Sequence, residues 1–269
     1  MDADHTLGGG WQLQPLNASS FCRTFCATKG TERLFVKRGH GEMLAAEADG
    51  LRAIAATGTV RVPQVVHDEP GVLALEWLDL HPPNAGFGER FAEALSRLHS
   101  TTARQYGWPR DNFIGATPQV NAPTQDWWDF FAEHRLRAMA KRLNGRVDDV
   151  VDRVIDAMPR LFEDGHVPRP SLIHGDLWAG NWGMLADGTP VIYDPAVSHS
   201  DAEAELAMME LFGSPPPGFW NAYGPVHAGY GQRRALYQLY HLLNHAVLFG
   251  GGYEAQARRV AAQVLASAA

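Results

Sequence analysis

The sequence has few of the features that mark secreted, membrane or nucleic-acid-binding proteins. Its 269 residues include only two cysteines, Cys22 and Cys26, which excludes a disulfide scaffold and suits a reducing compartment. No apolar run approaches the length of a membrane span, and residues 1–4 are acidic, unlike the start of a signal peptide. The net charge of −7 argues against a nucleic-acid partner, because such binding depends on a basic surface. We therefore expect a soluble cytoplasmic protein.

A pattern of polar residues that suits phosphoryl transfer is present instead. Within residues 171–194 (SLIHGDLWAGNWGMLADGTPVIYD), an apolar run ends in His-Gly-Asp176, Asn181 follows five residues later, and a second short apolar run leads to Asp194. The Asp-Gly pair at 187–188 predicts a hairpin. Phosphoryl transfer needs an aspartate that accepts the proton of the attacking hydroxyl, and an Asn and an Asp that hold magnesium on the nucleotide phosphates. We interpret Asp176 as the catalytic base and Asn181 and Asp194 as metal ligands, with ATP and Mg²⁺ as cofactors.

A lysine and a glutamate upstream fit the same chemistry. Residues 11–38 read as three strands, and Lys37 ends the apolar run of the third. From residue 41 onward, apolar residues at helical spacing predict a helix, with Glu47 directed toward the lysine. Such a pair orients the ammonium onto the α- and β-phosphates of ATP. The alternatives are a surface ion pair, which contributes little to stability, and no contact at all.

The turn between the first two strands is a candidate phosphate-covering loop. Its sequence at 17–22, NASSFC, offers backbone N–H groups around Ser19 and Ser20 that can bind phosphate oxygens. The segment lacks the glycines that are usual in such loops. Cys22 and Cys26 are interpreted as small packing residues, because no other thiol exists to complete a metal site.

Two further strands are predicted just before the composition changes to His-Pro-Pro. In a two-lobed kinase this is the hinge, where backbone groups bind the adenine edge of ATP, and Glu76, Trp77 and Leu78 would supply those groups. A plain edge strand is the alternative. We divide the chain into a nucleotide-binding lobe of residues 1–80 and a catalytic and substrate-binding lobe of residues 81–269.

Most of the second lobe is predicted to be helical from its apolar spacing. The helices include residues 127–143 and residues 196–213. The start of the second carries Asp201, Glu203 and Glu205, which either suit a helix N-terminus or, for one of them, shape the loop around Asp194. His241 and His245 are spaced like a zinc pair, but leucine replaces the glutamate of an HExxH motif, which favours core histidines. The predicted fold is α+β, with a small antiparallel-sheet lobe carrying one helix and a larger, mainly helical lobe.

With these elements placed, the chain resembles the fructosamine kinase (ketoamine 3-kinase) family. That family has the protein-kinase-like fold shared with aminoglycoside phosphotransferases and choline kinases. The HxDxxxxN pattern is common to all of them and selects no substrate. The more specific matches cover nearly the whole chain: EADGLRAI (47–54), NFIGATPQVN (112–121), LIHGDLWAGN (172–181), YDPAVSHSDAEAELAMMELFG (193–213) and YQLYHLLNHAVLFGGGY (237–253).

The resemblance implies ATP- and magnesium-dependent phosphorylation of the 3-hydroxyl of a ketoamine, the adduct of a sugar with a free or protein-bound amine. The 3-phosphate then eliminates and regenerates the amine, so the activity is a deglycation. The resemblance also places Trp178 beside the sugar and His174 in the substrate site.

Three points stay open at this stage. The preferred sugar could be ribulosamine, erythrulosamine or fructosamine. A phosphotransferase for an aminoglycoside or choline, or a nucleotide-binding protein without catalysis, are the competing interpretations. The loop at 17–22 lacks the Gly-Gly pair frequent in the family, which puts tight closure over the phosphates in doubt.

Overall fold

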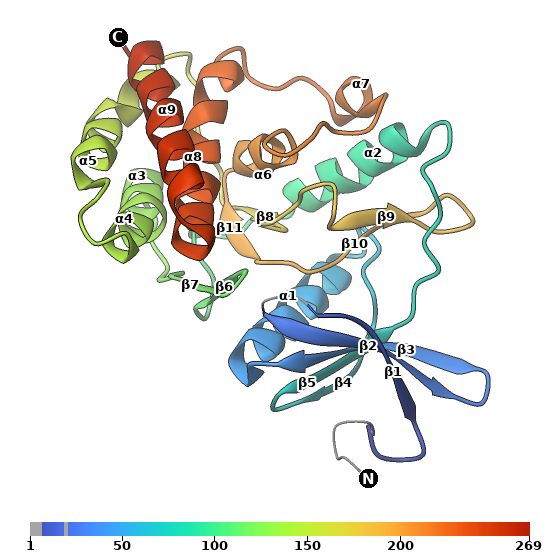
Figure 1. Cartoon of the computed structure of the whole chain (residues 1–269). Coiled ribbons are helices and arrows are strands. Elements are labelled where there is room, and N and C mark those ends of the chain that lie inside the picture. The colour runs from blue at the N-terminus through green and yellow to red at the C-terminus, as the bar shows by residue number, and fades with distance from the viewer. Residues whose placement is uncertain (1–6, 19–20) are drawn as a thin grey trace.

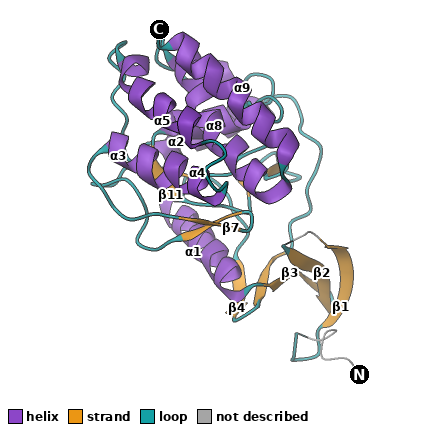
Figure 2. Ribbon diagram, turned by 60° about the vertical axis from the view of Figure 1, so that its left-hand side comes forward, coloured by secondary structure: helices purple, strands orange, loops and turns teal. Residues whose placement is uncertain are grey.

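The computed structural model describes residues 7–18 and 21–269 and shows two parts joined by one connection (Figure 1). An antiparallel sheet with the helix α1 (Gly41–Thr57) forms the first part, and helices dominate the second (Figure 2). Residues 77–86 lead from the last strand of the sheet to α2 (Phe87–His99), and the predicted division at residue 80 falls within this connection. The α+β prediction is confirmed. Within the described residues, no helix combines the length and the apolar character that crossing a bilayer requires.

The sheet has the strand order β1-β2-β3-β5-β4 and contains all five predicted strands. Its strands are β1 (Gln12–Ala18), β2 (Cys22–Lys29), β3 (Glu32–Gly39), β4 (Val65–Glu69) and β5 (Val72–Glu76). Gly30 and Gly71 have φ values of 61° and 84° in the two tight turns, a conformation that glycine adopts without steric cost. Lys37 pairs with Thr24 on one side and Leu73 on the other, so it lies on the central strand.

Helix α1 connects the sheet to the second part. Its buried residues Leu44 and Leu51 belong to a core that also contains Phe91 of α2 and Val197 of the second part. The helix also approaches the second part closely, because a Cβ added at Gly50 would lie 3.1 Å from the Cγ of Pro195. The two parts therefore share one apolar core, and α1 packs directly on the segment that follows Asp194.

The second part is built from helices and three short antiparallel strand pairs. The pairs are β6 (Asn112–Ile114) with β7 (Thr117–Gln119), β8 (Ser171–Ile173) with β11 (Ser198–Ser200), and β9 (Trp182–Met184) with β10 (Pro190–Ile192). After α2 come α3 (Trp127–Phe131), α4 (Ala138–Arg142), α5 (Asp148–Ala157), a 3₁₀ helix (Met158–Phe162), α6 (Ala202–Met209), α7 (Phe219–Tyr223), α8 (Tyr230–Phe249) and α9 (Gly251–Ser267). The β9–β10 pair is the hairpin that the Asp-Gly turn predicted.

Two helix predictions need correction. The helix expected over residues 196–213 begins only at Ala202, because Ser198–Ser200 pairs with β8 and Asp201 caps the helix by accepting a hydrogen bond from Glu203 N at 3.2 Å. The helix expected over residues 127–143 is interrupted by a π-helical stretch, Ala132–Arg137. The first helix starts late because residues 198–200 pair with a strand far away in the sequence, and the spacing of apolar residues cannot reveal such a pairing.

Candidate active site

Lys37 connects the sheet to the second part of the molecule. Its Nζ atom, on β3, lies 2.8 Å from Glu47 Oε1 on α1 and 2.7 Å from Asp194 Oδ1, beyond β10. Burial alone would lower the pKa of Lys37, but the carboxylates of Asp194 and Glu47 raise it above its ordinary value, so the ammonium stays charged. The structure thus forms the ion pair expected of Lys37 and Glu47 and adds a partner that sequence reasoning did not assign to it.

Asp194 has an unusual backbone conformation. Its φ of 60° lies in the left-handed region, which aspartate tolerates better than most side chains do. The side chain is 45% exposed, although its neighbours on β10 are buried. Such backbone strain is common where a functional side chain must be held in one direction. Here it directs a carboxylate into the space between the two parts of the molecule.

Asp176 and Asn181 belong to the loop between β8 and β9. The Asn181 amide donates through Nδ2 to the Asp176 carbonyl at 2.8 Å and, more weakly, to Asp176 Oδ2 at 3.4 Å. Burial, together with the carboxylates of Asp194 and Glu205, raises the pKa of Asp176 to about 7. A group that titrates close to neutral pH is well suited to accept a proton from a hydroxyl.

One cavity brings these residues together. It has a volume of about 340 Å³ and lies between the sheet and the second part, with Lys37, Glu47, Asp176, Asn181 and Asp194 in its wall. The two aspartates therefore face the same space, as the predicted site requires. We call this cavity the interlobe cleft.

Glu205 holds the loop that carries Asp176. It lies on α6 with 1% of its surface exposed, and its carboxylate accepts hydrogen bonds from His174 N at 2.8 Å and Gly175 N at 2.7 Å. His99 adds a third contact, with its Nε2 3.1 Å from Glu205 Oε2. Sequence reasoning had only counted Glu205 among the acids that begin a helix. The signal that could have identified it is a carboxylate in a helix whose other residues, apart from Glu203, are apolar, because a carboxylate in such a helix needs buried partners.

His174 contacts the loop that carries Asp176, between β8 and β9, rather than the cleft. Its side chain is completely buried, its Nδ1 accepts a hydrogen bond from Asp176 N at 3.3 Å, and its Nε2 lies 2.8 Å from the Tyr193 carbonyl. Burial lowers the pKa of His174, so the ring is neutral and Nε2 carries the proton. The expected contact of His174 with a substrate is not available to a side chain without exposed surface. Its contacts instead tie the Asp176 loop to the chain just before Asp194.

A second cavity, of about 280 Å³, opens beside the connection between the two parts. Its wall includes Phe35 and Leu75 of the sheet and the predicted hinge residues Glu76, Trp77 and Leu78. The backbone N–H and C=O of Leu78 have no hydrogen-bond partner within residues 7–18 and 21–269. An apolar slot beside free backbone groups suits the flat, polar-edged ring of adenine.

The polar side chains of Glu76 and Trp77 already have hydrogen-bond partners within the protein. The carboxylate of Glu76 pairs with Arg61, whose Nη2 lies 2.5 Å from Oε1, and also accepts a hydrogen bond from Gln64 N at 3.1 Å. The indole N–H of Trp77 donates to Asp79 Oδ1 at 3.0 Å. Backbone groups, rather than these side chains, are therefore what the hinge offers to a nucleotide.

The structure describes only part of the candidate phosphate-covering loop. Ser19 and Ser20 lie outside the described residues. Cys22 borders the interlobe cleft and Cys26 is buried in the sheet, and the two do not form a disulfide with each other. The packing role predicted for Cys26 agrees with its position.

Trp178 lies in the loop between β8 and β9, and 40% of its surface is exposed. It lies in the wall of the interlobe cleft and of a third cavity, of about 420 Å³, which also includes Asp176. The indole lies against Gly180, where an added Cβ would come within 2.3 Å of the ring, so only glycine permits this arrangement. The structure thus places Trp178 beside the expected base.

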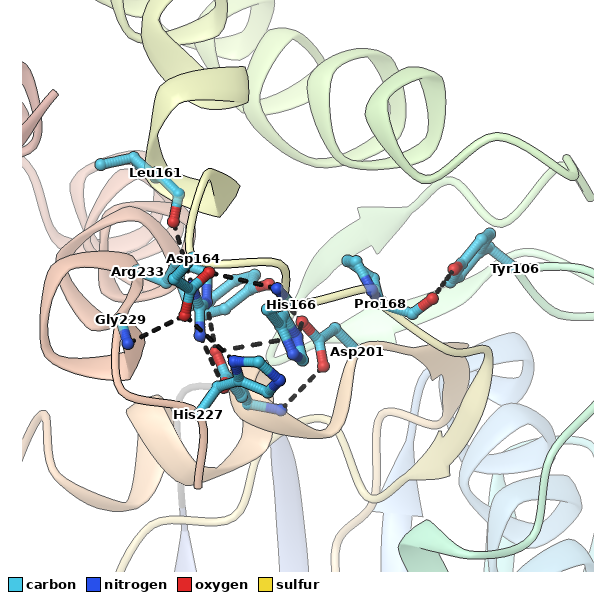
Figure 3. Close-up of polar contacts among 11 residues, drawn as sticks. Tyr106, Leu161, Asp164, His166, Pro168, Asp201, His227, Gly229 and Arg233 are labelled. Carbon is cyan, nitrogen blue, oxygen red and sulfur yellow. Dashed lines mark hydrogen bonds and ion pairs between the residues drawn. The ribbon is translucent and has the colours of Figure 1, made fainter. Parts of the chain in front are cut away.

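Of the two histidines that resemble a zinc pair, His241 is buried in the core, as expected, and His245 is half-buried in the wall of the third cavity. His241 is 5% exposed, and the ring of His245 bonds back to the His241 carbonyl, with its Nδ1 at 2.8 Å. Among the described residues, one cluster of three His, Cys, Asp or Glu side chains is close enough together to surround a metal ion: His166, Asp201 and Glu203. None of them lines the interlobe cleft, and Figure 3 labels His166 and Asp201.

The cluster around His166 is already saturated by protein partners. Asp201 Oδ2 accepts hydrogen bonds from the Tyr237 hydroxyl at 2.5 Å and lies 2.8 Å from His166 Nε2. Arg233 is completely buried, and its guanidinium donates to both carboxylate oxygens of Glu203, from Nε to Oε2 at 2.7 Å and from Nη2 to Oε1 at 3.0 Å. These contacts, several of which Figure 3 shows as dashed lines, make the cluster a buried ion-pair network that joins α6 to α8.

The fold and the site together define a phosphotransferase of the protein-kinase-like class. A crystal structure of a protein assigned as a fructosamine-3-kinase from Thermobifida fusca is similar with a TM-score of 0.85 and 32% identity, covering 94% of this chain and 93% of that one. The choline kinase LicA from Streptococcus pneumoniae has a TM-score of 0.64 at 14% identity, over 95% and 93% of the two chains, and so shares the fold.

Sequence comparison identifies the family. The family model for fructosamine kinase matches residues 11–267. A probable ketoamine kinase of Synechocystis is 44% identical over 255 residues, which cover 90% of this chain and 86% of that protein. A chloroplastic protein-ribulosamine 3-kinase of Oryza sativa subsp. indica is 37% identical, over 95% of this chain and 76% of its own length. The chain belongs to the fructosamine kinase family. This confirms the predicted family, fold and kinase class.

Proposed function

We propose that this protein transfers the γ-phosphoryl group of ATP to the 3-hydroxyl of a ketoamine carried by a free amine or a protein lysine. The observation that carries the proposal is the single cleft that Lys37, Asp176, Asn181 and Asp194 share. The names of the relatives, ketoamine kinase and ribulosamine 3-kinase, supply the substrate class. The phosphorylated product would eliminate its phosphate and release the amine, so the outcome is deglycation.

The nucleotide is assigned to the hinge and the lysine. The adenine ring would occupy the apolar slot beside Glu76, Trp77 and Leu78, with the backbone of Leu78 as hydrogen-bonding edge. The charged Lys37 would then meet the phosphates, held in direction by Glu47. Its present contact with Asp194 would be shared with the phosphate oxygens.

The oxygen ligands of the cleft suit magnesium. Asp194 offers a carboxylate, and Asn181 donates through Nδ2, which leaves its Oδ1 for a cation. Such hard oxygen ligands, completed by phosphates and water, are the ones that Mg²⁺ takes. When bound, the ion supplies charge neutralisation for the phosphates.

Asp176 is assigned as the base. It lies in the wall of both the interlobe cleft and the third cavity, so a hydroxyl held between these spaces can reach its carboxylate. A magnesium ion held by Asp194 would oppose the effect of that carboxylate, which helps to raise the pKa of Asp176. The charged, proton-accepting form of Asp176 is thereby favoured when the metal is in place.

ATP consumption measured with a panel of acceptors tests the proposal. We expect turnover with at least one of ribulose-lysine, erythrulose-lysine and fructose-lysine, and a much lower kcat/KM with kanamycin or choline. Preference for kanamycin or choline would instead make the protein an aminoglycoside- or choline-type phosphotransferase. ATP binding without transfer to any acceptor would contradict catalysis altogether. We assign the protein to the cytoplasm, where the cysteines Cys22 and Cys26, which form no disulfide, would stay reduced.

A further inference from the structure

The third cavity, next to Asp176, has a distinctive chemical character. Besides Asp176, the polar side chains in its wall are Asn244 and His245, and most of the rest is aromatic or aliphatic. Its wall, as described, contains no lysine and no arginine. The aromatic residues that surround it are Phe21, Trp178, Phe212, Phe249 and Tyr253. We call this space the acceptor cavity.

Asn244 is the unusual residue of the acceptor cavity. It lies on α8 with 2% of its surface exposed, and its Nδ2 donates to the Ile114 carbonyl at 3.4 Å. Its Oδ1 is buried and has no hydrogen-bond partner in the described part of the chain. A buried acceptor without a partner costs free energy, and native proteins rarely leave one unless a ligand or water completes it. The cavity therefore has a place for a donor at Asn244.

Aromatic rings continue from this point to the surface. Phe212 lies 4.7 Å from His245, His245 lies 5.0 Å from Tyr253, and Phe249 lies 6.0 Å from Tyr253, measured between ring centroids. Burial lowers the pKa of His245, so that its ring adds no positive charge to the row. Phe249 is 55% exposed and Phe212 37% exposed, so the row ends in solvent.

One ring of the cavity comes from the other part of the molecule. Phe21, which directly precedes β2, lies 6.5 Å from Phe249 of α8, measured between ring centroids. An aromatic pair at this separation is in favourable contact. The acceptor cavity is thus closed by side chains of both parts, and a molecule bound there touches the nucleotide-binding part directly.

We propose that the acceptor cavity binds the protonated amine of the ketoamine and its substituent, with Asn244 Oδ1 accepting a hydrogen bond from the ammonium N–H. The rings of Phe249 and Phe21 pack on the carbon chain that leads from the amine to the surface. Asn244 and Phe249 are then the residues that distinguish amine adducts from plain sugars. This assignment rests on the proposed ketoamine kinase function.

The chemistry of the acceptor agrees with the arrangement. The amine of a ketoamine lies close along its chain to the 3-hydroxyl, so a hydroxyl at Asp176 brings the ammonium into the adjoining space. An amide oxygen and aromatic faces stabilise a cation without adding another negative charge beside Asp176. A carboxylate in place of Asn244 would raise the already elevated pKa of the base further. The exposed end of the row leaves room for the remainder of a lysine or a protein.

The test compares two acceptors that differ only at the nitrogen: the ribulose adduct of Nα-acetyl-lysine, and its analogue with a methylene group in place of the amine. For the unaltered protein we expect KM for the analogue to be at least about tenfold higher, the range for loss of a charged hydrogen bond. Asn244→Leu should raise KM for the amine adduct to that of the analogue and leave KM for ATP unchanged. Equal KM values in the unaltered protein, or discrimination that persists in Asn244→Leu, would overturn the assignment.

A second variant covers the possibility that Asn244→Leu does not fold. Phe249→Ala changes an exposed side chain, and it should raise KM for the lysine adduct several-fold more than KM for the methylamine adduct. Trp220→Ala, at an exposed aromatic residue outside the cavity, is the matched control and should change neither KM. Equal effects of Phe249→Ala on both adducts would overturn the assignment. Failure to phosphorylate any ketoamine would overturn the proposed function itself, whereas turnover without amine discrimination overturns only this assignment.

Discussion

The ammonium of Lys37 lies 2.7 Å from the carboxylate of Asp194, although 157 residues separate them in the chain. This contact joins the central strand of the sheet to the segment after β10. Together with Glu47, it makes a three-residue ion cluster at the boundary of the two parts. Because a nucleotide phosphate can replace one carboxylate as the partner of the lysine, the cluster forms a site ready for an anion.

Replacing the lysine should separate stability from activity. Lys37→Met leaves the carboxylate of Glu47 buried without its partner, and we expect the free energy of unfolding to fall by about 3–5 kcal/mol. Adding Glu47→Gln should recover most of that stability, as measured by urea unfolding, because the unpaired charge is gone. Activity should stay about 10²–10³-fold low in both variants, the loss seen when an electrostatic contact to the reacting group is removed. Recovery of kcat/KM in the double variant would show that Lys37 does not act on the nucleotide.

Asp176→Asn should remove the base with little change to its loop. The hydrogen bond from Asn181 Nδ2 to the backbone carbonyl of residue 176 does not involve the side chain that changes. We expect kcat to fall by about 10²–10⁴-fold or more, while the Kd for ATP, measured by isothermal titration calorimetry, changes little. Near-normal turnover would mean that another group accepts the proton.

Asp194→Asn tests the metal site without disturbing the backbone, because asparagine also tolerates a φ of 60°. Loss of a residue that only supports a metal ligand lowers metal affinity by about 10–100-fold. Because Asp194 is a proposed direct ligand, the affinity for ATP in the presence of magnesium should fall by more than that. Affinity measured in EDTA should change far less. Asp187→Asn, in the exposed β9–β10 turn, is the control and should bind like the unaltered protein. Normal magnesium-dependent binding by Asp194→Asn would place the metal elsewhere.

Glu205→Gln should impair catalysis through the loop alone. A glutamine side chain offers one acceptor oxygen where two backbone N–H groups, of His174 and Gly175, now bind. One N–H is then left unpaired, at a cost of about 1–3 kcal/mol in stability. A misplaced loop should reduce kcat by up to about 10²-fold, with KM for ATP nearly unchanged. Glu210→Gln, at the other end of α6, should leave kcat as it is, and an equal loss in both would argue against the positioning role.

The ion-pair network of Figure 3 predicts a pH dependence of stability. Burial alone would lower the pKa of His166, but its hydrogen bond to Asp201 and the charges of Asp201 and Glu203 raise it above its ordinary value of about 6.5. The folded protein therefore holds the proton more tightly than the unfolded chain does. The stabilisation is fully present below about pH 6.5 and is lost as the pH rises through the raised value.

His166→Gln makes this dependence measurable. The difference in Tm between the unaltered protein and the variant should be largest on the acid side of about pH 6.5 and should shrink as the pH rises. His67, an exposed histidine that pairs with Glu69 on β4, offers a control as His67→Gln, for which we expect little difference at any pH. A Tm difference for His166→Gln that does not vary with pH would contradict the charged pair.

Several features of the protein follow from the sequence alone. The alternation of apolar residues predicted the sheet strands, the helical spacing predicted α1, and the Asp-Gly pair predicted the β9–β10 hairpin. Their spacing within residues 171–194 predicted Asp176, Asn181 and Asp194 as site residues, and the structure places them in the wall of one cleft. These signals are local, because a strand, a helix or a turn depends mainly on residues within a few positions of one another.

Other features depend on contacts between distant residues. The strand Ser198–Ser200 forms because β8 lies beside it, which displaced the start of α6 from its predicted position. His174 was expected to contact the substrate, but its side chain is completely buried and its Nε2 contacts the Tyr193 carbonyl.

The most important of these contacts bring buried charges together. The sequence by itself determined which acids, amides and lysine the protein has, and in which secondary structures they stand. Only the tertiary structure decided that Lys37 meets Asp194 and that Glu205 holds the loop of Asp176. The physical reason is that a buried charge must find a partner wherever the folded chain provides one, and that partner can lie at any separation in the sequence.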